Sequence, residues 1–233
     1  MARWRCMWVE GRSPELSVDQ AGRVQERRLV DWLTGLAKRK DLGQYDQTAA
    51  DRAVAAENRA TLAILRRGLG KPVGENLRLY PYIMRFVPAL TDRERYESTL
   101  DSYILIATLF AHHTLTVDKG NLGTTMAAVR KEAENRRAGA ESIEKRFVAL
   151  LNSHRDDLPN HLRHVISLVA AREVPVNWLK LLEDIQHWDN PWRSVQSSWA
   201  RSFWAEASSA SSSPDNQPTG EGSEALEKEE EPA

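Results

Sequence analysis

The sequence predicts an all-α protein of about nine helices arranged in two small bundles. Three observations predict this class. Apolar residues recur at three- and four-residue spacing in one segment after another, which is typical of helices with one buried face. No segment alternates apolar and polar residues as a half-buried strand does. Capping and turn residues separate the segments by short loops, which favours helices packed against their neighbours in the chain.

The first two helices are expected at about 20–39 and from Thr48 to about Gly70. Thr48 and Asp51 have the spacing of a capping box, in which each side chain bonds the backbone N–H of the other residue. Gly68 and Gly70 suit the end of the second helix. The residues expected on the core faces are Val24, Val30, Leu33, Ala37, Val54, Leu62, Leu65 and Leu69.

Two more helices are expected before the middle of the chain. Pro81 suits the first turn of a short third helix that reaches Val87. Thr91 with Glu94 is expected to cap a long fourth helix. The residues that repeat at helical spacing along this fourth helix are Tyr96, Leu100, Tyr103, Ala107 and Phe110.

Five helices are expected in the second half. One contains Met126 and Val129, and Ser142 is expected to cap the next. Asp157 with Pro159, Asn177, and Asn190 with Pro191 are expected to open the remaining three. The apolar residues expected to be buried along these helices are Ile143, Phe147, Leu150, Leu151, Leu162, Val165, Ile166, Val169, Trp178, Leu181, Leu182, Ile185, Trp188, Val195, Trp199 and Phe203.

Composition divides the 233 residues into four parts. The turn-rich stretch 116–123 separates an N-terminal bundle, 21–117, from a C-terminal bundle, 121–206. An irregular extension, 1–20, precedes them. Residues 207–233 are rich in serine, proline and glutamate and contain one large apolar residue, so this tail is predicted to be disordered.

The net charge of −1 averages two unlike parts. The tail holds seven acidic residues and one lysine, a net of −6, so residues 1–206 carry a net of +5. A mildly basic helical body suits contact with a polyanion, and it equally suits a basic domain with a solubilising tail. Charge alone leaves both interpretations open.

Several function classes find no support in the sequence. No window approaches the roughly 18 uncharged apolar residues of a membrane span, and the N-terminus lacks the apolar core of a signal peptide, so we expect a cytoplasmic protein without a membrane partner. Cys6 is the only cysteine, which excludes an internal disulfide. No phosphate-binding loop, dinucleotide-binding glycine motif or serine-hydrolase turn occurs. We therefore expect no enzymatic activity and no cofactor.

Three histidines supply an enzymatic alternative. His161 and His164 lie three residues apart on one expected helix, a spacing from which two side chains can reach one metal ion. His154 lies just before that helix. No carboxylate accompanies these histidines in a recognised motif, so a metal-dependent hydrolase that uses them is retained only as an alternative.

Basic residues and tryptophans are the more informative residue types. Arg66 and Arg67 end the second expected helix, and the helix dipole favours cations there. The alternative is a set of cations that follows a phosphate backbone and binds without reading the bases. Five of the eight tryptophans fall within 27 residues, and most of these fit apolar stripes. Trp192 and Trp204 fit the stripes least and are candidates for contact with a partner.

Seven segments occur in a characteristic order. They are Arg-Leu-Val-Asp-Trp-Leu at 28–33, Leu-Ala-Ile-Leu-Arg-Arg-Gly-Leu-Gly at 62–70, Asn-Leu-Gly at 121–123, Ser-Ile-Glu-Lys-Arg-Phe-Val-Ala-Leu-Leu at 142–151, His-Leu-Arg-His-Val-Ile at 161–166, Val-Asn-Trp-Leu-Lys-Leu-Leu-Glu-Asp-Ile-Gln-His-Trp at 176–188 and Val-Gln-Ser-Ser-Trp-Ala-Arg-Ser-Phe at 195–203. As an ordered set they resemble the CasB small subunit of the type I-E CRISPR surveillance complex, Cascade, over about residues 24–205.

The resemblance implies a non-catalytic helical subunit of an antiviral defence complex. Such subunits are present as two copies, contact the backbone and large subunits, and help hold the R-loop open by binding nucleic acid without sequence preference. The implied partners are single-stranded DNA or the crRNA–DNA hybrid, those subunits and a second copy of the chain. The binding residues that the resemblance implies are Arg66, Arg67, Arg85, Lys145, Arg146 and Arg163. Those added on charge and placement alone are Lys38, Arg39, Lys40, Lys71 and Arg193.

Two non-enzymatic alternatives remain open. A generic helical DNA-binding regulator would need a recognition helix, and none of the expected helices has the short turn and exposed polar face of a helix-turn-helix motif. A purely structural spacer predicts that reversing the charge of the basic residues leaves nucleic-acid affinity unchanged while assembly persists.

Overall fold

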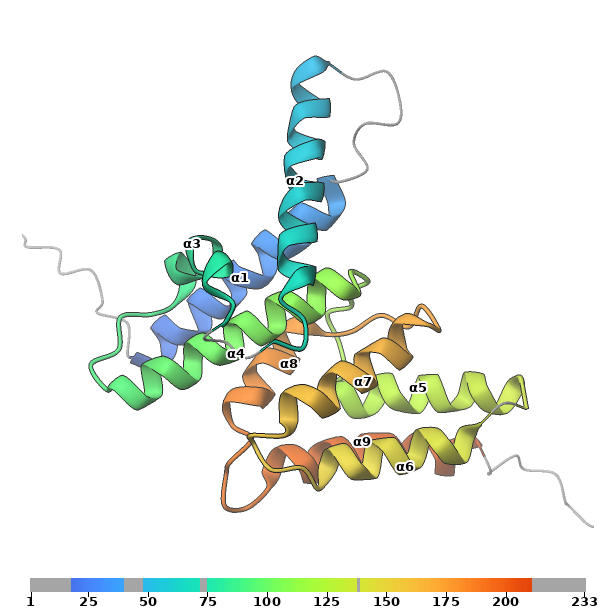
Figure 1. Ribbon diagram of the computed structural model, residues 1–233. Helices are drawn as coiled ribbons and strands as arrows, with labels where there is room; N and C mark the ends of the chain where they lie inside the picture. The colour runs from blue at the N-terminus through green and yellow to red at the C-terminus, as the bar shows by residue number, and fades with distance from the viewer. Residues whose placement is uncertain (1–17, 40–47, 72–74, 138, 211–233) are drawn as a thin grey trace, which may run out of the picture.

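The computed structural model describes residues 18–39, 48–71, 75–137 and 139–210, and it confirms the predicted helical class (Figure 1). Nine α-helices lie in these ranges: α1 Val18–Arg39, α2 Ala49–Arg67, α3 Tyr80–Ile83, α4 Arg93–His112, α5 Leu122–Asn135, α6 Ala140–Leu151, α7 Leu158–Ala170, α8 Trp178–Gln186 and α9 Ser194–Ala210. Two short 3-10 helices, Leu77–Leu79 and Met84–Phe86, flank α3.

Two predicted helix starts are confirmed in atomic detail. Thr48 Oγ1 accepts the backbone N–H of Asp51 at 3.3 Å, and Asp51 Oδ2 accepts the N–H of Thr48 at 3.2 Å, so α2 begins with a complete capping box. Asn177 Oδ1 accepts the N–H of Lys180 at 3.1 Å and caps α8. These bonds satisfy N–H groups that otherwise have no partner in the first turn of a helix.

Three predicted starts are wrong. Asp92, not Thr91, caps α4 by accepting the N–H of Arg95 at 3.0 Å. The segment capped by Ser142 in our prediction begins earlier, after Gly139, whose φ of 75° lies in the left-handed region that glycine enters without strain. Finally, α9 begins at Ser194 rather than at Asn190, because residues 190–193 form a tight turn.

The helical regions also extend beyond the predicted ends. The first helix begins at Val18, inside the extension predicted to be irregular, and α9 reaches Ala210, inside the predicted tail. The remaining residues of both terminal segments, 1–17 and 211–233, lie outside the described ranges.

Helices from both predicted bundles share one core. In the first half α1, α2 and α4 pack against one another, and in the second half α5 packs along α9 and α6 while α6 packs on α7. Helix α8 contacts both α4 and α1 (Figure 1). The buried apolar side chains of the described residues form a single cluster that runs through both groups. The proposed division at residues 117–121 stays a prediction.

The predicted core residues are buried or half-buried with two exceptions. Val24 is 46% exposed and Val54 is 40% exposed. The buried face of α1 instead runs through Leu29, Leu33 and Leu36, to which Val24 does not align. Val54 lies in the N-terminal half of α2, which extends beyond the other helices (Figure 1).

His113 joins the end of α4 to the segment that precedes α8. Its side chain is buried, and Nε2 lies 2.7 Å from the carbonyl oxygen of Val174. Burial lowers the pKa of His113 below its ordinary 6.5, and nearby His112 lowers it further, while the Val174 carbonyl opposes the shift.

This buried histidine predicts a pH-dependent stability. The unfolded chain takes up a proton at His113 near pH 6.5, where the folded chain still holds the ring neutral, so stability is fully present above that pH and falls as the pH drops. Urea denaturation between about pH 8 and pH 5 should show this loss, and His113→Gln should reduce it. If the free energy of unfolding changes equally with pH in wild type and in His113→Gln, His113 is not the source of the pH dependence.

Candidate nucleic-acid interface

The C-terminal end of α2 is held against the C-terminal end of α4. Arg66 Nε donates to the carbonyl oxygen of Ala111 at 2.8 Å, where a helix end leaves carbonyl groups without partners. Asn76 Nδ2 donates to the carbonyl oxygens of Gly68 and Lys71, both at 3.2 Å. These contacts fix the turn that follows α2.

Arg163 reaches this turn from α7. A Cβ atom placed on Gly70 would lie 2.7 Å from Nη1 of Arg163, so the guanidinium group packs directly over the glycine. One turn further along α7, Ser167 Oγ lies 3.3 Å from Nε2 of His112 at the end of α4. The contacts bring a predicted cation of the second half against the turn that lies between Arg67 and Lys71 of the first.

We call Arg66, Arg67, Lys71 and Arg163 the α2-end cluster. The first three side chains are exposed and Arg163 is half-buried. Within the described ranges, none of the four forms an ion pair with a carboxylate. Four cations without an ion-pair partner, three at or just after the end of α2 and one packed over the turn that follows it, suit the binding of an anion such as a phosphate backbone.

Three other predicted cations are engaged within the fold. The guanidinium carbon of Arg85 lies 4.7 Å from the ring centroid of Trp32, in a cation–π contact. Lys145 Nζ pairs with Glu141 at 2.6 Å. Arg193 Nη2 donates to the carbonyl oxygen of Leu151 at 2.5 Å and so satisfies the last turn of α6.

The remaining predicted cations are not joined to the cluster by any contact among the described residues. Lys38 and Arg146 are exposed, and neither side chain has an ion pair or hydrogen bond with a described residue. The side chain of Arg39 and the whole of Lys40 lie outside the described part of the chain. Lys38 and Arg146 therefore stay predictions, while at the end of α2 a cation from the second half packs beside the turn that carries cations of the first.

Arg155 is a structurally important cation that the sequence does not reveal. Its Nη2 donates to Ser98 Oγ at 2.9 Å and Ser102 Oγ at 3.1 Å, both on α4. Its Nη1 donates to the carbonyl oxygen of Ile185 on α8 at 2.5 Å, and Nε lies 3.5 Å from Asp189. The residue follows His154 and precedes two aspartates in a short loop, and its partners are far away in the sequence, so no local signal identifies it.

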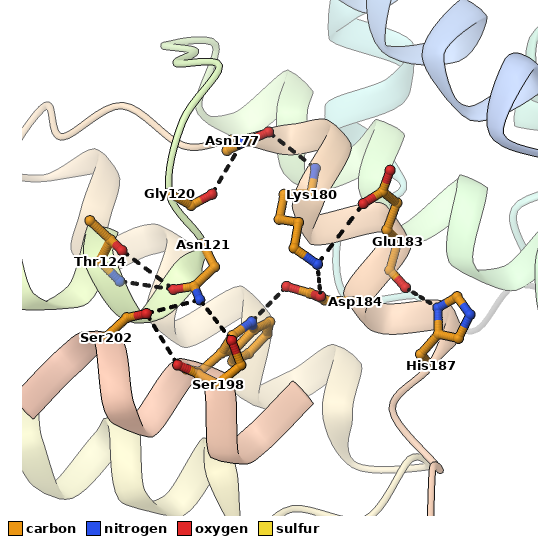
Figure 2. A network of polar contacts seen from close by, with 11 residues as sticks. Gly120, Asn121, Thr124, Asn177, Lys180, Glu183, Asp184, His187, Ser198 and Ser202 are labelled. Carbon is orange, nitrogen blue, oxygen red and sulfur yellow. Dashed lines mark hydrogen bonds and ion pairs between the residues drawn. The ribbon is translucent and has the colours of Figure 1, made fainter. Parts of the chain in front are cut away.

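A polar network joins α5 to α9 (Figure 2). Asn121 caps α5 by accepting the N–H of Thr124 at 3.1 Å. The amide nitrogen of the same side chain donates to Ser198 Oγ at 3.3 Å and Ser202 Oγ at 3.0 Å on α9. The Asn121 side chain therefore both caps α5 and holds α9 against it.

The same network continues to α8 through a buried carboxylate (Figure 2). Asp184 accepts from Lys180 Nζ at 2.5 Å and from Trp199 Nε1 at 2.7 Å. The Trp199 ring also packs on Trp188, with ring centroids 5.2 Å apart. Because the carboxylate is both charge-paired and hydrogen-bonded, its burial is compatible with a stable core.

The histidine alternative gains no support from the geometry. His154 lies 3.5 Å from Asp156. Neither the three histidines nor any other described residues form a group of three or more histidine, cysteine, aspartate or glutamate side chains able to hold a metal ion. No helix in the described ranges is long and apolar enough to cross a membrane.

The two tryptophans singled out from the sequence differ. Trp192 is 86% exposed on the turn before α9, as predicted. Trp204 is half-buried, and its ring packs against Phe203 and Phe147 at centroid distances of 5.0 and 6.2 Å. Of the two candidates, Trp192 therefore presents the larger surface for contact with a partner, while much of the Trp204 ring packs inside the fold.

Comparisons with known proteins agree on one family. The family model described as CRISPR-associated protein Cse2 matches residues 61–204. A curated CRISPR-associated protein Cse2 from Thermus thermophilus is 32% identical over 182 residues, which cover 78% of this chain and 91% of the relative. The crystal structure of CasB from M. ruber is 25% identical, with a TM-score of 0.59 over 80% of this chain and 98% of that one.

A chain of a structure described as a CRISPR RNA-guided surveillance complex has the same fold. Its TM-score is 0.59 at 18% identity, and the match covers 81% of this chain and 99% of that chain.

Proposed function

The chain belongs to the Cse2 family of CRISPR-associated proteins, the CasB-type small subunits of Cascade, and from this membership we propose a non-catalytic role in a crRNA-guided surveillance complex. In that complex it binds single-stranded DNA without reading its sequence and so stabilises the R-loop. Its protein partners there are the backbone and large subunits and a second copy of itself, and the complex acts in the cytoplasm.

The observation that carries the nucleic-acid part of this proposal is the α2-end cluster. Arg163 packs over Gly70, beside the end of the helix that carries Arg66 and Arg67. Guanidinium and ammonium groups bind phosphate oxygens through charge-assisted hydrogen bonds, which need no particular base. Binding of this kind tolerates any sequence and weakens steeply with salt.

The surroundings of the cluster limit the path of the strand. A cavity of about 630 Å³ adjoins Gly70 and Lys71 on the side of α4. Its wall carries the carboxylates of Glu94, Glu97 and Asp101, which repel phosphates. The strand is therefore proposed to cross the outer side of the cluster, away from α4.

A few backbone contacts are sufficient for such a role. Pairing between a guide and its target is nearly balanced in free energy against the DNA duplex that it replaces. Each charge-assisted contact to the exposed strand then contributes about 1.5–3 kcal/mol to the open state, enough to lengthen its lifetime severalfold or more.

The proposal is tested on a cognate guide complex assembled without its small subunit. Adding the full chain should lengthen the lifetime of the R-loop, measured by single-molecule or strand-displacement methods. A chain that joins the complex without changing the lifetime would favour the structural spacer. A chain that fails to join, yet binds duplex DNA, would favour the regulator.

A further inference from the structure

The proposed function gives no role to the most strongly charged segment of the sequence. Residues 211–233, which we call the acidic tail, hold seven acidic residues and one lysine, a net charge of −6. They follow α9, which ends at Ala210, and the match to the family model ends earlier, at residue 204. The acidic tail is therefore an addition to the region that matches the family.

The negative charges of the acidic tail are concentrated near its end. Five of the seven acidic residues lie within 224–231, and three of them are successive, at 229–231. Successive residues of an extended chain are about 3.5 Å apart, close to the roughly 3.4 Å between phosphates along one strand of duplex DNA. Carboxylate and phosphate oxygens both accept charge-assisted hydrogen bonds from guanidinium and ammonium groups. The acidic tail therefore offers a basic surface the same kind of ligand that a nucleic-acid strand offers.

The α2-end cluster suits this ligand. Its four cations form no ion pair with a carboxylate in the described part of the chain, and all but the half-buried Arg163 are exposed. The carboxylates of Glu94, Glu97 and Asp101 in the adjoining cavity repel the acidic tail as they repel phosphates. The tail and a DNA strand would therefore compete for the same outer side of the cluster.

The acidic tail is long enough to reach the cluster. Glu224 lies 14 residues beyond Ala210, and 14 extended residues span up to about 45–50 Å. Helix α9 packs along α5, and α5 contacts α7, which carries Arg163. Packed helices lie about 8–10 Å apart, so Arg163 is roughly 20 Å from α9 across the bundle. Even with the full length of α9 added along its axis, about 25 Å for 17 residues, the path is within reach.

We propose that the acidic tail occupies the α2-end cluster of the free chain and that single-stranded DNA must displace it. A tethered segment competes at its effective concentration, about 1 mM for a short tether. With a dissociation constant of about 0.1 mM, the weak end of non-specific contacts to a polyanion, the tail lowers the apparent affinity for DNA about tenfold. The inference rests on the proposed function, because it assigns an intramolecular competitor to the same cluster.

This competition has a consequence for the surveillance complex. A free chain is restrained from binding any nucleic acid that it meets, because the tail occupies its cations. A strand that the assembled complex holds beside the cluster is present at a high local concentration and displaces the tail. Neither step depends on base sequence, in agreement with binding through the phosphate backbone.

The test compares the affinity of two chains of all 233 residues for an oligothymidylate at low salt. In the neutral-tail variant the seven acidic residues of 211–233 are replaced with the corresponding amides, so that every described residue is unchanged. The neutral-tail variant should bind about tenfold more tightly than wild type. Rising salt should reduce this difference, because the contact between tail and cluster is electrostatic. Fluorescence anisotropy measures both effects.

A second background separates a local contact from net charge. Lys71→Gln with Arg163→Gln removes two of the cations that the tail occupies. Neutralising the tail in this background should raise the affinity for the oligothymidylate by less than about twofold, because the two changes act on one contact. An equal gain in both backgrounds would show that the tail repels DNA through net charge alone and would overturn the inference.

Chemical coupling detects the contact without DNA. A carbodiimide joins carboxylates to lysine amines that touch them, and mass spectrometry identifies the joined residues. In wild type, Lys71 should be coupled to glutamates of 224–231 more than Lys131, an exposed lysine of α5, is. An excess of oligothymidylate should suppress the coupling of Lys71. Coupling of Lys131 to the same extent as Lys71 would overturn the inference.

The results distinguish this inference from the proposed function. Equal binding of the oligothymidylate by wild type and the neutral-tail variant would overturn the inference and leave the proposed function standing. If neither chain binds while Lys71 is still coupled to the tail, the proposed function fails and the intramolecular contact remains. A neutral tail that leaves DNA affinity unchanged but prevents the chain from joining the complex would assign the tail to another subunit and overturn the inference.

Discussion

Replacing Arg67, Lys71 and Arg163 together with glutamine is expected to weaken binding of single-stranded DNA by about a thousandfold or more at low salt. The reason is the loss of three phosphate contacts from the α2-end cluster. The same loss should make the plot of log affinity against log salt shallower by about 2, because each contact to a single strand contributes roughly 0.7 to its slope. Arg66 is left intact because its Nε holds the Ala111 carbonyl and its removal would also disturb the fold.

A charge-matched control separates this local effect from net charge. Arg93, Lys131 and Arg201 are exposed cations on α4, α5 and α9, and their replacement with glutamine removes the same three charges. The control should bind with a slope close to that of wild type. Similar losses of affinity in both triple variants would show that binding depends on net charge alone. That outcome would contradict a specific role for the α2-end cluster. Fluorescence anisotropy at several salt concentrations measures both quantities.

The helices were predictable because their signals are local. Apolar spacing and the Thr48–Asp51 box lie within a few residues of one another, and the structure confirms the corresponding helix. The start of α9 was not predictable from the sequence. Asn190 and Pro191 are residue types that commonly begin a helix, but here they belong to the turn that precedes α9. In that turn Arg193 adopts a φ of 48° and bonds Leu151, which is 42 residues away. Tertiary contact overrides local preference there.

The candidate site was predictable by residue type but not by arrangement. Charge identifies Arg66, Arg67 and Arg163 as candidates, and nothing in the sequence states that α7 reaches the turn after α2. At that meeting Arg163 packs over Gly70. Conversely, the stacking of Arg85 on Trp32 is a contact across the fold that charge and spacing do not reveal.

Buried polar residues were the least predictable class. Glu26 occupies a core-facing position between Gln25 and Arg27 on α1, and a single sequence gives no reason to expect it to be buried. The sequence around Arg155 likewise does not indicate its structural role, because its four partners come from α4, α8 and the turn after α8. Their identification needs the packing of helices that are distant in sequence.

Gly123→Ala is expected to destabilise the protein by about 3 kcal/mol, an overpacking effect at the high end of its usual range. Gly123 lies in the first turn of α5, where that helix crosses α9. A Cβ atom there would lie 2.1 Å from the carbonyl oxygen of Trp199 and 2.8 Å from its carbonyl carbon. These are backbone atoms, so no rotation of a side chain relieves the clash and the two helices must separate. Urea denaturation measures the change in the free energy of unfolding.

Gly35→Ala is the matched control, because it makes the same change within α1 where no heavy atom lies within 4 Å of the added Cβ. It should leave stability unchanged or raise it by roughly 0.5–1 kcal/mol, since alanine favours a helix over glycine. A small cost for Gly123→Ala would mean that α5 and α9 tolerate separation. A large cost would explain the glycine by close helix packing alone, since the hydrogen bonds from Asn121 to Ser198 and Ser202 require the two helices to stay in contact.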